Sequence, residues 1–168
     1  MTVLNRETKL VQNPALGAML LWRFAVGYEE GSQSRDPSPI LLLFLVLPII
    51  YYEDTLKYLL STRKPSGLRI FVGKFSESKA LANDQILTIQ SRSLRMRNLT
   101  MDSIKLAISS SLIALDYKKG FAIPISKTPP KSGIPKSIRE MLTGAEKFGF
   151  WCSLLSLHEV SAILKVSF

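Results

Sequence analysis

The side chains that most often supply nucleophilic, acid–base or metal chemistry are scarce in this sequence. It contains one cysteine, Cys152, and one histidine, His158. The two lie close together in a segment that reads as helical, and this does not favour a protease-like pair of nucleophile and base. No Cys-x-x-Cys, His-x-x-x-His or glycine-rich phosphate-binding motif occurs. The sequence therefore predicts a protein that is not an enzyme and that holds no cofactor or metal.

Basic side chains are the second chemical feature, because they are unevenly distributed along the chain. Residues 1–62 carry a net charge of −1 and residues 63–168 a net charge of +10. This asymmetry predicts that the later part contacts nucleic acid or an acidic protein surface, although a generally basic surface is an equal alternative. The candidate contact residues are Arg92, Arg95, Lys105, Lys118 and Lys119. Arg23, within an apolar segment, is expected to be a paired charge at the edge of the core or a partner contact.

Length and composition predict a single domain over residues 1–168. The chain is 46% hydrophobic, which is enough for one good core. A single cysteine excludes an intramolecular disulfide framework and indicates a reducing compartment, so we expect a cytoplasmic protein.

Residues 40–52, "ILLLFLVLPIIYY", form an uninterrupted apolar run of thirteen residues. As a helix this run would span about 20 Å, against about 30 Å for the hydrocarbon core of a bilayer. Pro48 lacks an N–H and would kink a straight helix. We therefore predict a buried core helix and no membrane partner.

Local signals predict further elements around this run. Asn13 followed by Pro14 is typical of a helix start. Asp54 is a candidate cap for the next helix, and residues 67–75 are compatible with either a helix or a strand. Further helices are expected from about residue 83, from Thr100 as N-cap, from Pro135, and from Ser156, which forms a capping box with Glu159. "DYKKG", with Gly120 in the turn, predicts a β-hairpin.

These elements predict a mainly α fold, a compact helical domain with a winged-helix-like core and one small β-hairpin. Its winged-helix-like part is expected at about 66–126 and a C-terminal helical part at about 134–168. Lys105 would lie on the second helix of the module and Lys118 and Lys119 at the wing tip. Arg92 and Arg95, three residues apart, would share a face from which Arg97 points away. Residues 103–115 contain serines and one lysine but no Arg, Asn or Gln, so we expect contact with the DNA backbone or with protein.

Four stretches of the chain resemble a known family. They are "NPALGAMLLWRF", "FLVLPIIYYEDTLKYLLSTRKPSGL", "SRSLRMRNLTMDSIKLAI" and "SLHEVSAILKV". Together they look like the small middle components of bacterial ABC three-component conflict systems, with the third resembling that family's helix-turn-helix region. The similarity runs over residues 13–166.

The resemblance implies a non-catalytic adaptor subunit. Such middle components are encoded between an SMC-like ATPase and a toxic effector, often a nuclease, as in Lamassu-type anti-phage and anti-plasmid defence systems. The subunit would dock on the ATPase and help hold the effector inactive until foreign DNA is sensed, with double-stranded DNA as a further partner of the complex. Two alternatives stay open. One is a stand-alone winged-helix DNA-binding regulator, and the other is a peripheral membrane protein that uses the apolar run and the basic half.

Overall fold

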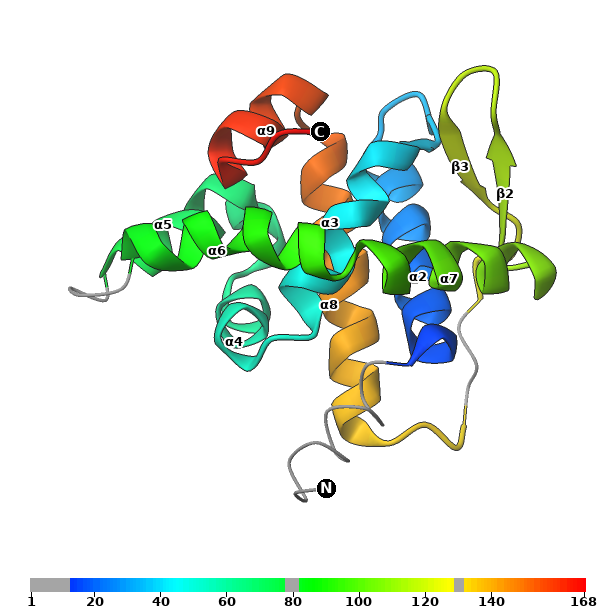
Figure 1. The fold of residues 1–168 in the computed structure, drawn as a ribbon, viewed down its shortest axis with the longest axis horizontal. Helices are drawn as coiled ribbons and strands as arrows, with labels where there is room; N and C mark the ends of the chain where they lie inside the picture. Colours follow the sequence, from blue (N-terminus) through cyan, green and yellow to red (C-terminus); the bar gives the residue numbers. More distant parts are fainter. Residues whose placement is uncertain (1–12, 78–81, 129–131) are drawn as a thin grey trace.

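A computed structural model of the chain describes residues 13–77, 82–128 and 132–168. Within these residues the fold consists of eight α-helices, one short 3₁₀ helix and a three-stranded antiparallel sheet (Figure 1). This confirms the predicted mainly α class with one small hairpin.

Helices α2 (Pro14–Gly31) and α8 (Lys136–Ser153) run side by side in the same direction and form the centre of the molecule (Figure 1). As predicted, Asn13 caps α2, since its Oδ1 accepts a hydrogen bond of 2.7 Å from the backbone N–H of Leu16. The two helices touch backbone to backbone at Gly27 and Gly149. A Cβ atom on Gly27 would overlap the carbonyl of Glu146, and one on Gly149 would overlap a carbonyl of α2. Glycine is therefore required at this crossing.

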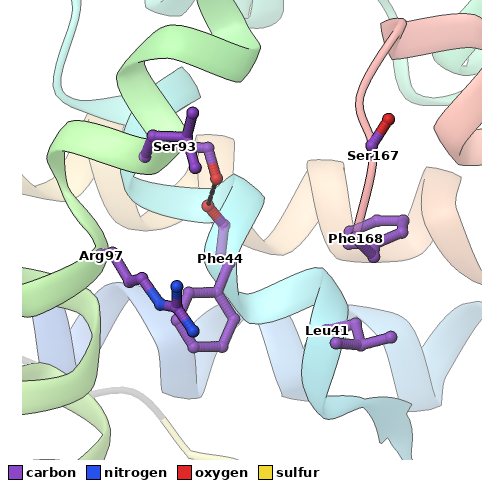
Figure 2. A pocket seen from close by; sticks show the side chains of 7 residues that line it. Leu41, Phe44, Ser93, Arg97, Ser167 and Phe168 are labelled. Carbon is purple, nitrogen blue, oxygen red and sulfur yellow. Dashed lines mark hydrogen bonds between the residues drawn. The ribbon is translucent and has the colours of Figure 1, made fainter.

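The apolar run forms helix α3 (Ile40–Ile50), and the prediction of a buried core helix is confirmed. Pro48 lies inside this helix and lacks the N–H that would bond to the carbonyl of Phe44. The Ser93 hydroxyl donates a hydrogen bond of 3.1 Å to that carbonyl (Figure 2). The carbonyl that the proline leaves without a main-chain donor is thus hydrogen-bonded to a neighbouring helix. In the described part of the chain, no helix combines the length and apolar character needed to span a bilayer.

Helices α4 (Glu53–Ser61) and α5 (Gly67–Glu77), joined through the 3₁₀ helix η1 (Lys64–Ser66), follow α3. Residues 67–75 are therefore helical. Asp54 lies in the first turn of α4, whose N-cap is Tyr52, so the predicted cap is wrong. Lys147 of α8 donates to the carbonyls of Leu59, Leu60 and Thr62, and so satisfies the C-terminal end of α4. Helix α9 (Leu157–Leu164) begins with the predicted capping box.

Helices α6 (Ala82–Arg95) and α7 (Arg97–Ser109) follow each other end to end, separated only by Met96 (Figure 1). The N–H of Met96 donates to the carbonyl of Arg92 in α6, and the carbonyl of Met96 accepts from the N–H of Thr100 in α7, so Met96 is bonded to both helices. Thr100 is buried inside α7, so the prediction that it is the N-cap is wrong.

The sheet contains the predicted hairpin and one unpredicted strand. Strands β2 (Ile113–Asp116) and β3 (Phe121–Pro124) form the hairpin, and Gly120 has the positive φ of 73° that this turn requires. Strand β1 (Ser38–Pro39) pairs antiparallel with β3, which gives the order β1-β3-β2. The predicted winged-helix-like part, 66–126, does not include β1.

The winged-helix arrangement stays a prediction. The hairpin follows α7 as expected, and the small sheet lies at the end of that helix. However, the helices of a helix-turn-helix meet at about 90–120° through a turn of three or four residues. The end-to-end junction of α6 and α7 differs from that geometry.

Candidate interaction surface

Arg92, a predicted partner contact, is buried in the structure. Its guanidinium bonds to both carboxylate oxygens of Asp54, at 2.7 and 3.2 Å, and lies 3.8 Å from the centre of the Tyr52 ring. Only 8% of the residue is exposed. A bidentate pair of this kind fixes α6 against the start of α4. Arg92 therefore has a structural role, whereas Arg95, three residues later on the same helix, is exposed.

Arg95 and Lys105 are both exposed, on α6 and α7 respectively. Lys105 is 3.3 Å from Asp102 in an ion pair between exposed side chains, which stabilises little in water. Ten residues of nearly continuous helix separate the two cations, or about 15 Å. They therefore do not form a single binding cluster.

Lys118 and Lys119 occupy the hairpin turn and are exposed. Their backbone N–H groups donate to Asp116 Oδ1, each at 3.1 Å, which orders the turn. The N–H of Ile40 donates to the carbonyl of Gly120 at 2.9 Å. This bond places the basic turn beside the first residues of α3.

The structure reveals an open groove that the sequence analysis missed (Figure 2). We call it the α3–α7 groove. It has a volume of about 180 Å³ and is lined by Leu41, Phe44, Ser93, Leu94, Arg97, Ser167 and Phe168. Arg97, which the sequence analysis set aside, lies in its wall. The spacing of Leu94, Arg97 and Met101 was the available signal, because residues three and four apart share a helix face.

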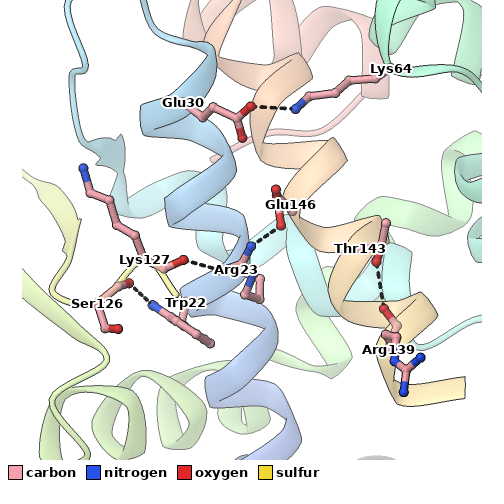
Figure 3. Close-up of polar contacts among 9 residues, drawn as sticks. All are labelled: Trp22, Arg23, Glu30, Lys64, Ser126, Lys127, Arg139, Thr143 and Glu146. Atoms are coloured by element: carbon pink, nitrogen blue, oxygen red, sulfur yellow. Dashed lines mark hydrogen bonds and ion pairs between the residues drawn. The ribbon is translucent and has the colours of Figure 1, made fainter. Parts of the chain in front are cut away.

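A partly buried polar network holds the segment that follows the hairpin (Figure 3). Arg23 pairs with Glu146 and donates a bond of 3.0 Å to the carbonyl of Lys127. The Trp22 indole N–H donates to the carbonyl of Ser126. Arg23 is therefore a paired charge at the edge of the core, which is one of the two roles that the sequence predicted for it. The network also anchors the end of the hairpin on α2.

Cys152 and His158 do not form a reactive pair. Cys152 is fully buried, and burial raises the pKa of its thiol above the ordinary value of 9.0. His158 is exposed on α9. Within residues 13–77, 82–128 and 132–168, no group of three or more His, Cys, Asp or Glu is placed to hold a metal ion.

The described structure thus defines a small, mainly α protein that carries an open apolar groove with basic residues beside it. The chain belongs to the family described as ABC-three component (ABC-3C) system Middle Component 3, whose model matches residues 1–168. Membership is consistent with an accessory subunit of a multi-subunit conflict system. No curated protein and no solved structure matches the chain.

Proposed function

We propose that this chain is a non-catalytic adaptor subunit of a bacterial anti-phage defence complex of the Lamassu type. It links an SMC-like ATPase to a toxic, often nuclease-like, effector. It helps to restrain that effector until foreign DNA is sensed. The observation that carries the proposal is the match of the middle-component family along the whole chain.

The surface of the molecule supports a role in assembly. Leu41, Leu94 and Phe168 are large apolar side chains that remain exposed around one groove. A contiguous apolar surface rimmed by polar groups is typical of a protein–protein interface. The chain therefore has a surface that association with another subunit would bury.

The other four candidate contact residues, all exposed, are proposed contacts for DNA or for an acidic face of a partner. They are Arg95, Lys105, Lys118 and Lys119. Arg92 is left out because its guanidinium is occupied by Asp54. Double-stranded DNA would then be held at its phosphates, since lysine binds phosphate as a point charge.

One observation favours the alternative, a stand-alone winged-helix DNA-binding regulator. Helix α7 begins at Arg97 and not at Thr100, so Arg97 and Asn98, both exposed, belong to its first turn. Arg and Asn are the residue types that read base edges, and recognition helices place them near their N-terminus.

Co-expression separates the two functions. The tagged chain is produced together with the products of its two flanking genes and analysed by size exclusion and mass. An adaptor elutes in a stable complex with a coiled-coil ATPase. A homodimer that leaves both neighbours behind would contradict the adaptor function and make sequence-specific DNA binding the next measurement.

A further inference from the structure

We propose that the α3–α7 groove is the docking site for an acidic, amphipathic helix of a partner subunit, which inserts an apolar side chain over Phe44. This inference rests on the proposed function, because it names the surface through which the adaptor is held in its complex.

Three large apolar side chains around the groove are exposed. Leu94 is 63% exposed, Phe168 47% and Leu41 43%, and they surround the half-buried ring of Phe44. Binding energy at interfaces concentrates where a few apolar anchors fill a pocket that excludes water. A volume of about 180 Å³ gives room for a large apolar side chain of that kind.

A row of exposed residues extends the groove along the helices. Leu94, Arg97, Met101 and Lys105 follow each other at intervals of three and four residues, and all four are exposed. Leu94 and Arg97 both line the groove, and Arg97, Met101 and Lys105 lie on one face of α7 because residues four apart are neighbours on a helix surface. The row alternates apolar and cationic side chains. Its complement is a helix that alternates apolar side chains with carboxylates.

The charge around the groove selects an acidic occupant. None of the groove-lining residues is Asp or Glu, and no carboxylate of the described part of the chain forms an ion pair with Arg97. The turn that carries Lys118 and Lys119 lies beside the start of α3, next to Leu41, through the bond between Ile40 and Gly120. Positive charge therefore lies along one wall and beyond one end.

The same charges disfavour the other occupants. A second copy of this chain, joined by a two-fold axis, would bring the same basic surface of both copies together, so that cations such as Arg97 and Lys105 face cations. DNA would meet the cations but would leave Leu41, Leu94 and Phe168 without apolar partners. A helix with carboxylates and apolar anchors satisfies both groups.

The test uses the full chain in the co-expressed complex and compares two double variants. L94E/R97E changes the groove. L154E/K57E makes the same change in charge elsewhere: Leu154 is 56% exposed, and Lys57 is an exposed residue of α4. Thermal unfolding checks that both variants are folded before their binding is compared. We expect L94E/R97E to bind the purified partner subunit at least tenfold more weakly, and L154E/K57E to bind like the unmodified chain.

A photo-crosslinking measurement identifies the occupant. p-Benzoylphenylalanine replaces Leu94 in one variant and Leu154 in the other, each within the assembled complex. Crosslinking from position 94 to a partner peptide that is helical and net negative supports the proposal. Crosslinking to a second copy of this chain, or to DNA, overturns it.

Comparing the assembly of the unmodified chain with that of L94E/R97E separates a wrong groove assignment from a wrong adaptor function. If the unmodified chain assembles and L94E/R97E assembles equally well, the groove assignment is wrong while the adaptor function stands. If the unmodified chain does not assemble with either neighbour, both are overturned.

Discussion

Ser93 supplies a hydrogen bond in place of one that Pro48 cannot make. A proline inside a helix removes a hydrogen bond and costs roughly 3 kcal/mol or more. The carbonyl of Phe44 that loses its partner instead accepts from the Ser93 hydroxyl. This hydrogen bond joins α3 to α6 through two residues that are 49 positions apart in the sequence.

Ser93→Ala should therefore destabilise the fold by about 1–2 kcal/mol, because it leaves the Phe44 carbonyl without its side-chain donor. Ser91→Ala is the matched control, since Ser91 is exposed on the same helix, and it should change stability by less than about 0.5 kcal/mol. Urea unfolding monitored by circular dichroism measures both. Equal midpoints for the two variants would show that the Ser93 bond contributes nothing.

Buried acidic groups predict sensitivity to alkali. Burial raises the pKa of Cys152 above 9.0 and that of Tyr51 above 10.0. In the folded state both groups keep their protons at a pH at which the unfolded chain loses them. The folded state then binds more protons, so the free energy of unfolding falls as pH rises above about 9, by about 1.4 kcal/mol per pH unit for each proton.

Cys152→Ala removes the contribution of the thiol to this pH dependence of the free energy of unfolding. The variant should be less stable at pH 7, because it leaves a small cavity, but its stability should fall less steeply just above pH 9. Lys147, whose pKa is lowered by burial and by Lys74, acts in the opposite sense and is unchanged in both proteins. Denaturant titrations between pH 7 and 10 measure the slopes. Parallel curves would mean that the folded state does not protect the thiol.

At the scale of elements, local signals predicted some helix ends and one turn correctly, whereas the caps predicted at Asp54 and Thr100 are wrong. The caps at Asn13 and Ser156 and the turn at Gly120 depend on neighbours within a few residues, and all three are confirmed. Strand β1 has two residues and exists only because β3, more than eighty residues later, pairs with it. No periodicity in the sequence could reveal it.

The crossing of α2 and α8 also depends on partners far apart in sequence. Gly149→Ala should destabilise the protein by about 2–3 kcal/mol, because the new methyl group overlaps the carbonyl of Phe24. Gly73→Ala on α5 is the control, since a Cβ there meets no atom within 4 Å. It should be neutral or stabilise by up to about 1 kcal/mol. Calorimetry decides, and a Gly149→Ala protein as stable as the unmodified chain would refute the close crossing.

The candidate surface could be predicted from the sequence only in part, for a related reason. A run of cations is visible in the sequence, but the pairing of Arg92 depends on Asp54, 38 residues earlier. The groove combines residues from α3, α6 and α7 with the segment after α9, and no one stretch encodes it. Arg97 was not among the predicted contact residues because α7 was expected to begin at Thr100, whereas it begins at Arg97, which lines the groove.

At the scale of the whole molecule, the excess of positive charge predicts how the complex responds to salt. The triple variant R95E/K118E/K119E removes three exposed cations without touching the buried pair of Arg92. If these residues contact phosphates, the assembled complex should bind DNA more weakly, and its slope of log K against log salt should shrink by about 3. Fluorescence anisotropy at several salt concentrations measures this. Unchanged affinity and slope would remove these residues from the DNA contact.

One purification tests directly whether this chain links an ATPase to an effector. The tagged ATPase is isolated from cells that express all three components and from cells that lack only this chain. If the chain is the adaptor, native mass spectrometry should find the effector bound to the ATPase in the first preparation and absent from the second. An ATPase–effector complex of undiminished yield without this chain would rule out the adaptor function.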